Sequence, residues 1–401
     1  MSRLDELIQK LCPDGVEYKT IGTICETLKK ATLKKGELKS EGYPVINSGR
    51  TLYGYYDKYN NEGPAFTVAA RGEYAAFVNY FDKRFWAGGL CYPYKSKDES
   101  KNSTKFIYYS LKNIQQRIRD GIVAEGSIPA LNKSDFENIK LPVPPLEVQR
   151  EIVRILDNFT ELTAELTAEL TARKNQYEYY RDALLTFNDN NLLHSFISRY
   201  CPNGVEYKKI GDIASVDRGG NLQKKDFCEH GIPCIHYGQI YTKYGLFASK
   251  SYTFIDSECA SKQRFAHKND IAMAVTSENI EDVCKCVAWF GEEDAAVSGH
   301  SAIIRHNQNA KYLVYYFHSS MFFLQKKKLA HGTKVIEVTP SDLLDVKIPI
   351  PPLEVQHQIV QILDRFDALC NDLTQGLPAE IEARRKQYEY YRDQLLTFKR
   401  A

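Results

Sequence analysis

The feature that most constrains this sequence is an internal duplication. Three motifs occur once in each half: CPDGVEYK at 12–19 and CPNGVEYK at 201–208, LPVPPLEVQ at 141–149 and IPIPPLEVQ at 348–356, and QYEYYRD at 176–182 and 387–393. The centres of the two copies share almost nothing. Because each copy of a repeat normally forms the same supersecondary unit, near-identical ends and different centres predict one frame that carries two different domains.

The spacing of the repeated motifs locates the length differences. The offset between copies is 189 at the first motif, 207 at the proline motif and 211 at QYEYYRD. The second copy therefore gains 18 residues in its centre and four more after the prolines. At 401 residues, with roughly 100–200 residues per domain, the chain has room for two to four domains.

The segment after each proline motif is predicted to be a long helix. Leu146–Phe187 contains no Gly or Pro and follows Pro144 and Pro145, which suit the first turn of a helix. Apolar residues recur at spacings of three, four and seven and predict a stripe through which the two copies pair. The predicted pairing residues are Ile155, Phe159, Leu162, Leu166, Leu170 and Tyr177 in the first copy, and Ile362, Phe366, Leu369, Leu373, Tyr388 and Leu395 in the second. Gly376 and Pro378 predict a break in the second copy.

A tetrapeptide, TAEL, occurs at 163–166 and again at 167–170. Four residues of α-helix turn about 400° and rise about 6 Å, so each TAEL lengthens the helix while moving the leucine stripe about 40° around it. The repeat is interpreted as an adjustable spacer. The alternative is a low-complexity run selected for helix propensity.

The centres are predicted to be mixed α and β. FTVAAR at 66–71 and DIAMAVT at 270–276 are typical strands, and KFIYYSLKNIQQRI at 105–118 has helical periodicity. The predicted fold class is α+β, with two mixed α/β domains and two long helices that form an antiparallel coiled coil with a pseudo-twofold repeat. The predicted boundaries are 1–145 (head 1), 146–190 (first helical segment), 191–352 (head 2) and 353–401 (second helical segment).

Charge divides between the helical segments and the heads. Residues 146–187 and 353–398 each contain five basic and eight acidic residues, so each carries −3, and the rest of the chain carries +8 within a net charge of +2. Basic heads favour a nucleic acid and acidic helices favour a protein partner.

Candidate DNA-contacting residues are basic clusters, arginines beside glycines, and polar residues at matching positions of the two copies. Arginine donates two hydrogen bonds to guanine or binds phosphate, and a neighbouring glycine allows close approach of the backbone. The candidates are Lys34, Lys35, Asn47, Ser48, Arg50, Arg71 and Tyr74 in head 1, and Arg218, His236, Tyr237, Gln239, Thr276, Ser277, Lys326, Lys327 and Lys334 in head 2. Solvated surface charge and divergent loops are the alternative interpretation.

No catalytic or metal-binding motif is predicted. The chain lacks a phosphate-binding loop and the Asn/Asp-Pro-Pro-aromatic motif of amino-methyltransferases, because both Pro-Pro pairs precede Leu. A nuclease motif around Asp14 and Glu17 is disfavoured because the second copy has Asn203 where the first has Asp14. Cys228, His230, Cys234 and His236 lack a common zinc-finger spacing.

The location is predicted to be cytoplasmic. No apolar run is long enough for a membrane span, and the start MSRLDELIQK does not resemble a signal peptide. The ten cysteines are scattered and favour reduced thiols over a disulfide framework.

The repeated motifs resemble those of the specificity subunits of type I restriction-modification enzymes, and the TAEL repeats resemble one subgroup of that family. The similarity extends from Leu4 to Phe398. It implies a non-catalytic subunit whose heads each recognise one half of a split double-stranded DNA sequence. It also implies that both helical segments bind two methyltransferase subunits, which carry S-adenosylmethionine and methylate adenine. Motor-nuclease subunits that use ATP and magnesium are the further partners, so this chain needs no cofactor of its own.

Two other classes remain open from the residues alone. One is a single-chain nuclease or methyltransferase, which requires a catalytic motif that the sequence does not display. The other is a coiled-coil adaptor whose heads bind protein. Loss of DNA binding with increasing salt favours the DNA-binding class, and absence of DNA binding favours the adaptor.

Overall fold

The computed structural model describes residues 3–188 and 191–401. The chain divides into two compact units: unit 1 comprises Met1–Thr167 and Glu380–Ala401, and unit 2 comprises Ala168–Ala379. Each unit therefore combines one head with helical residues from both repeats.

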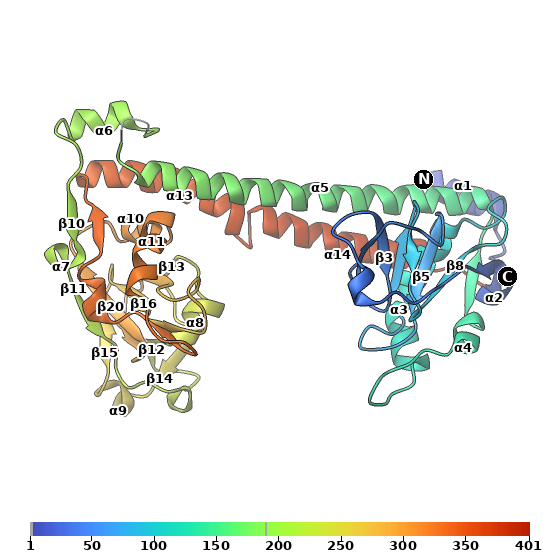
Figure 1. The fold of residues 1–401 in the computed structure, drawn as a ribbon, viewed down its shortest axis with the longest axis horizontal. Helices are drawn as coiled ribbons and strands as arrows, with labels where there is room; N and C mark the ends of the chain where they lie inside the picture. Colours follow the sequence, from blue (N-terminus) through green and yellow to red (C-terminus); the bar gives the residue numbers. More distant parts are fainter. Residues whose placement is uncertain (1–2, 189–190) are drawn as a thin grey trace. The chain divides into compact units, whose positions relative to one another are not determined.

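Head 1 contains two small sheets beside helix α3 (Thr104–Ile122) (Figure 1). The first sheet is antiparallel, with the order β2 (Cys25–Thr27), β8 (Cys91–Ser96), β5 (Ala65–Ala69) and β6 (Val78–Phe81). The second has the order β4 (Gly54–Tyr56), β3 (Tyr43–Ile46) and β7 (Trp86–Ala87). All five residues of β5 are buried, as expected for a central strand. The remaining elements of head 1 are α1 (Arg3–Leu11), β1 (Glu17–Thr20), α2 (Ile21–Ile24), η1 (Lys35–Glu37), α4 (Lys133–Glu137) and β9 (Lys140–Val143).

Head 2 repeats this strand order with additions. Its larger sheet has the order β11 (Ala214–Arg218), β20 (Ser301–His306), β16 (Ile271–Ala274), β18 (Cys286–Trp289) and β13 (Phe247–Ala248). The second sheet has the order β14 (Thr253–Ile255), β12 (Ile232–Ile235), β19 (Ala295–Val297) and β15 (Arg264–Ala266). The remaining elements of head 2 are α6 (His194–Tyr200), β10 (Tyr207–Lys209), α7 (Ile210–Ile213), η2 (Lys224–Asp226), α8 (Tyr237–Thr242), α9 (Ser257–Ala260), β17 (Thr276–Ser277), α10 (Ala310–Phe317), α11 (Ser320–Leu329), β21 (Ile336–Glu337), α12 (Pro340–Leu343) and β22 (Lys347–Pro349).

The two heads thus share a strand order although their centres differ in sequence. The order β2-β8-β5-β6 in head 1 matches β11-β20-β16-β18 in head 2, and β4-β3-β7 matches β14-β12-β19. Even an unusual backbone conformation recurs, because Ala76 and Cys284 both have positive φ, at 73° and 65°. Strands β13 and β15 and helices α8 and α9 account for the longer centre of the second copy. The predicted mixed α/β character of both heads is confirmed.

The helical segments form α5 (Leu146–Leu185), α13 (Leu353–Asn371) and α14 (Leu377–Leu395). Helix α5 begins directly after Pro144 and Pro145, as predicted, and ends at Leu185. The predicted end of this segment, residue 190, lies outside the described residues. The predicted break in the second copy is present between α13 and α14. A Cβ atom at Gly376 would lie 2.6 Å from the carbonyl oxygen of Ala368, so a side chain does not fit there.

Helices from the two repeats pack antiparallel within each unit. In unit 1, the rings of Phe159 and Tyr391 stack with centroids 5.6 Å apart, and Leu395 packs in the same cluster as Leu156. In unit 2, the rings of Tyr180 and Phe366 stack at 5.1 Å. The predicted residues Ile155, Tyr177, Ile362 and Tyr388 also belong to these clusters.

Two predicted pairing residues do not fit this arrangement. Leu373 follows the end of α13 and is 80 % exposed, and Leu369 is 39 % exposed. The break that Gly376 introduces removes Leu373 from the helix, so the periodicity used to place it no longer applies. Leu162, Leu166 and Leu170 are half-buried.

Candidate nucleic-acid interface

Each head is attached to its own helical segment through a buried glutamine. Gln149 accepts a hydrogen bond from the Ser103 backbone N–H (2.8 Å) through its Oε1 atom and donates to the Pro144 carbonyl (2.7 Å) through its Nε2 atom. Gln356 does the same in unit 2, accepting from the backbone N–H of Asn309 at 3.0 Å and donating to the Pro351 carbonyl at 2.8 Å. Both glutamines are fully buried, so these bonds satisfy groups that water cannot reach.

A carboxylate eight residues further on, about two helical turns, makes a second attachment. Asp157 on α5 accepts from Lys105 Nζ (2.7 Å) and Tyr109 OH (2.6 Å) on α3. In unit 2, Asp364 on α13 accepts from Lys311 Nζ at 2.6 Å and Tyr315 OH at 2.7 Å. Burial and the neighbouring carboxylate raise the pKa of both tyrosines, so they remain donors.

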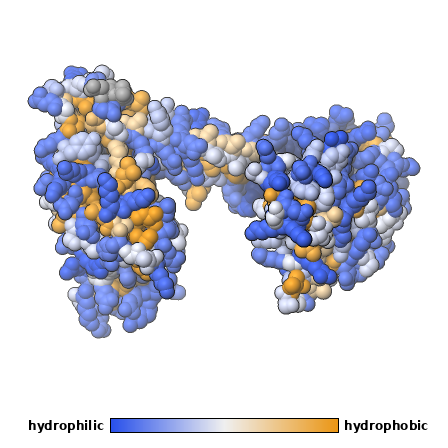
Figure 2. All heavy atoms as spheres, in the orientation of Figure 1, coloured by the Kyte–Doolittle hydropathy of each residue, from blue (hydrophilic) through white to orange (hydrophobic). Residues whose placement is uncertain are grey.

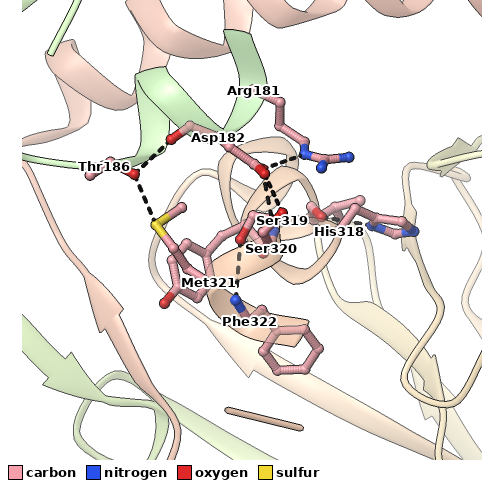
Figure 3. Close-up of polar contacts among 10 residues, drawn as sticks. Arg181, Asp182, Thr186, His318, Ser319, Ser320, Met321 and Phe322 are labelled. Atoms are coloured by element: carbon pink, nitrogen blue, oxygen red, sulfur yellow. Dashed lines mark hydrogen bonds and ion pairs between the residues drawn. The ribbon is translucent and has the colours of Figure 1, made fainter. Parts of the chain in front are cut away.

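The helix of the other repeat holds each head as well (Figure 3). In unit 2, the Asp182 carboxylate on α5 accepts from the backbone N–H (3.3 Å) and the hydroxyl of Ser320, at the start of α11. Thr186 Oγ1 donates to the Met321 sulfur at 3.1 Å. In unit 1, Arg392 on α14 donates to Asn113 on α3 at 3.0 Å. Helices from both repeats therefore fix the position of each head.

Two of the candidates in head 1 lie at the turn between β7 and β8. The Oδ1 atom of Asn47 accepts from the Leu90 backbone N–H at 2.9 Å. The Arg50 guanidinium lies 4.8 Å from the centre of the Tyr74 ring. Arg71 is exposed and follows Ala70, whose N–H donates to the Leu90 carbonyl at 2.9 Å. This turn thus brings Asn47 and Arg71 into one area, while Arg50 and Tyr74 form a cation–π pair of their own.

The other candidates in head 1 do not join this cluster. Lys34 and Lys35 are exposed at the start of η1, where the Lys34 N–H donates to Glu37 at 2.7 Å. Ser48 is half-buried beside Asn47. These positions are compatible with contacts to a phosphate backbone, which require accessible donors.

The candidates in head 2 form a connected cluster. Arg218 pairs with Glu337, and Glu337 lies opposite Thr276 in the register of β17 and β21. The Thr276 hydroxyl contacts Nδ1 of His300 at 3.2 Å. The ring of Tyr237 lies between His300 and His236, with centroid distances of 4.9 Å and 4.6 Å. Ser277 follows Thr276 in β17.

Sequence reasoning overlooked His300 and Glu337. Neither belongs to a repeated motif or a basic cluster. Their role in the cluster depends on strand pairing, which brings residues from five distant segments together.

Four predicted contact residues are buried and have internal structural roles instead. Gln239 is 8 % exposed and accepts from Thr253 Oγ1 at 3.1 Å and from the His236 N–H at 3.3 Å. Lys326 is 5 % exposed, and its ammonium group donates to the carbonyls of Glu281 (2.9 Å) and Val283 (2.6 Å). Neither side chain is available at the surface, so both leave the candidate interface. His236 and Thr276 are each 6 % exposed and leave it as well, because they support the rings of Tyr237 and His300 from below the surface. Lys327 and Lys334 are exposed and remain in it.

Within residues 3–188 and 191–401, no three His, Cys, Asp or Glu side chains converge to hold a metal ion. The Cys228 thiol donates to the His230 carbonyl at 2.9 Å. Across the described helices, none has an apolar stretch of membrane-spanning length. On the visible face, hydrophilic residues predominate, with smaller hydrophobic groups between them (Figure 2).

The structure thus has two heads with one strand order and unlike polar clusters, and helices of both repeats hold each head. The family model of the type I restriction modification DNA specificity domain matches the chain twice, over residues 13–173 and 202–383. The chain belongs to this family of type I restriction-modification specificity subunits, which recognise a DNA target as part of a complex.

Individual relatives cover nearly the whole chain. It is 32% identical to the Escherichia coli type I restriction enzyme EcoR124I/EcoR124II specificity subunit, covering 99% of this chain and 97% of that one. It is 30% identical to a Haemophilus influenzae protein named as a specificity subunit of this type, covering 96% of both. The crystal structure of the type I system S subunit from M. genitalium has the same fold, with a TM-score of 0.60, 18% identity and coverage of 96% and 97%. The predicted family and fold class are confirmed, while the TAEL subgroup stays a prediction.

Proposed function

We propose that head 1 and head 2 each recognise one half of a split double-stranded DNA sequence, so that partner subunits methylate adenine or cut the DNA. The observation that carries this proposal is that head 1 and head 2 share one strand order but differ in the side chains at equivalent positions. Equivalent backbone positions hold the exposed Arg71 in head 1 and the buried Thr276 in head 2, where the Thr276 hydroxyl contacts the exposed His300. Hydrogen-bonding groups that differ at equivalent positions suit different base sequences.

The catalytic steps belong to the partners in this proposal. Two methyltransferase subunits carry S-adenosylmethionine, and motor-nuclease subunits use ATP and magnesium, while this chain holds no cofactor. The complex acts in the cytoplasm, where the DNA is.

Repeated exposed residues on the helices support two copies of one partner. Tyr179 and Tyr390 occupy the same place in the two QYEYYRD motifs and are 64 % and 62 % exposed. Each contacts the next tyrosine edge-on, with centroids 5.4 Å apart. Packing does not require an exposed tyrosine, and tyrosine is enriched at protein interfaces. Two matching surfaces therefore favour two identical methyltransferase subunits.

A salt-titrated DNA-binding assay with and without the co-purified methyltransferase subunit tests the proposal. We expect sequence-specific binding that weakens steeply with salt, and methylome sequencing of cells with the intact system that reports a split motif. Methylation by this chain alone supports the single-chain enzyme instead. Absence of DNA binding in both conditions supports an adaptor.

A further inference from the structure

The turn that connects β7 to β8 in head 1 is held by two backbone hydrogen bonds. The Gly88 N–H donates to the Ile46 carbonyl at 2.7 Å. The Ala70 N–H donates to the Leu90 carbonyl at 2.9 Å. These bonds tie the turn to the ends of β3 and β5, and they place Leu90 at its tip.

The same two bonds occur in head 2. The Ser298 N–H donates to the Ile235 carbonyl at 3.1 Å, and the Val275 N–H donates to the His300 carbonyl at 2.9 Å. These bonds tie the turn between β19 and β20 to the ends of β12 and β16. His300 therefore occupies the position that Leu90 occupies in head 1, an equivalence that the dissimilar sequences conceal.

Leu90 is an exposed apolar side chain among polar ones. It is 43 % exposed. Its own N–H is held by Asn47, and Lys30 Nζ donates to the neighbouring Gly89 carbonyl at 3.2 Å. A Cβ atom at Gly88 would lie 2.6 Å from Asn47 Oδ1, so the turn needs glycine to bring Asn47 and Leu90 together. The backbone is thus shaped to present a leucine beside a lysine and an asparagine.

His300 presents a polar group from the equivalent position. It is exposed, and its Nδ1 atom is engaged by the Thr276 hydroxyl at 3.2 Å. The Tyr237 ring packs against it at 4.9 Å. These contacts set the orientation of the imidazole and leave Nε2 as the ring atom for a ligand.

We infer that Leu90 and His300 are specificity-determining residues, each at the base-contacting tip of its head. Leu90 contacts the C5-methyl group of a thymine, and Nε2 of His300 hydrogen-bonds to N7 of a purine. Only thymine offers a methyl group in the major groove, and purine N7 accepts a hydrogen bond there. The inference rests on the proposed recognition of a split DNA sequence.

Uracil substitution tests the leucine contact. The complex with the methyltransferase subunit is titrated with its target DNA, in which deoxyuridine replaces each thymine of one half-site in turn. We expect one substitution to weaken binding by the wild-type complex about fourfold, the effect of one buried methyl group. Leu90→Ala should bind the thymine DNA about fourfold more weakly and lose the sensitivity to uracil, whereas Leu90→Met should keep it. Leu11→Ala, which changes a 36 % exposed leucine on α1 of the same unit, is the control.

A 7-deazapurine scan of the other half-site tests the histidine contact. We expect one position at which removal of N7 weakens wild-type binding severalfold and has no effect on His300→Ala. Thr276→Val should reduce this sensitivity because it frees the imidazole. Leu324→Ala, at an exposed site on α11, should change neither half-site.

The outcomes separate the inference from the function on which it rests. If the wild-type complex binds no split sequence, the proposed function fails. If it binds one, but no thymine responds to uracil or Leu90→Ala retains the response, the leucine assignment is overturned. A deazapurine response that persists in His300→Ala overturns the histidine assignment, as does a variant that alters both half-sites.

Discussion

The two heads and the two helical segments differ in what the duplication has kept. In the heads, the strand order is shared but the exposed side chains are not, as Leu90 and His300 show. In the helical segments, individual side-chain bonds recur, and Gln149 and Gln356 make the same pair of contacts. A strand order needs only backbone hydrogen bonds and a buried apolar pattern, whereas an attachment point needs a particular side chain. The heads could therefore diverge in recognition while their placement stayed the same.

Exchange of a head should have the largest effect and tests whether recognition belongs to the heads and placement to the helical segments. Residues 20–140 transplanted into the frame of the Escherichia coli relative should carry their half-site with them, because Gln149 and Asp157 stay in the frame and their partners on or beside α3 move with the head. Methylome sequencing of cells with the chimera measures the outcome. A folded, active chimera that keeps the recipient's half-site contradicts the modular interpretation.

Insertion of one more TAEL after Leu170 changes the frame and leaves the heads intact. The insertion adds about 6 Å and 40° to α5, and one base-pair step is about 3.4 Å. Both half-sites should persist while the unrecognised spacer lengthens by one or two base pairs. The methylome of the variant reports the new motif. An unchanged spacer in a fully active variant contradicts a role of the repeat in spacing.

Loss of one glutamine attachment should destabilise one unit. Gln149→Leu leaves the Ser103 N–H and the Pro144 carbonyl without their buried partner, which should lower the free energy of unfolding of unit 1 by about 2–4 kcal/mol. Denaturant unfolding measures the change, and Gln116→Leu on the exposed face of α3 is the control. Equal stability of the two variants would show that the attachment contributes little.

Arg71→Ala should have a smaller and more local effect. Because Arg71 is exposed beside the turn that presents Leu90, its loss should weaken or relax one half-site by about 1–3 kcal/mol and leave the other unchanged. Binding to DNA with single substitutions in each half-site measures this. Loss of discrimination at both half-sites indicates a defect of the frame, and unchanged binding excludes Arg71.

Sequence reasoning predicted the features that follow from local patterns. The start of α5 after the prolines and the break around Gly376 depend on backbone chemistry that each residue carries with it. The shared strand order was not predictable because strand pairing depends on contacts between distant segments. Lys326 was misjudged because a run of three lysines resembles a solvated face, yet the turn of α11 directs one of them to two buried carbonyls. The attachment role of Gln149 could have been suspected from the sequence only because the second copy has the same residue, Gln356, at the matching position.

A final difference between the heads concerns two half-buried bases at equivalent positions. Lys112 on α3 and His318 after α10 share the offset of 206 that also relates Lys105 to Lys311. Burial lowers the pKa of Lys112 to about 8 and that of His318 to about 4. The same site therefore holds a cation in head 1 and a neutral ring in head 2 at neutral pH.

This difference predicts an acid sensitivity that is specific to unit 2. In the unfolded chain His318 binds a proton near pH 6.5, whereas in the folded head burial and the nearby positive charge of Arg181 and Lys326 hold its pKa near 4. The unfolded state thus binds more protons between these values, so stability falls as the pH drops from 6.5 to 4. His318→Leu should reduce the slope of unfolding free energy against pH in this window, while His230→Leu, at an exposed site, should not. Parallel pH profiles for the wild type and His318→Leu would mean that the ring becomes protonated without disturbing the fold.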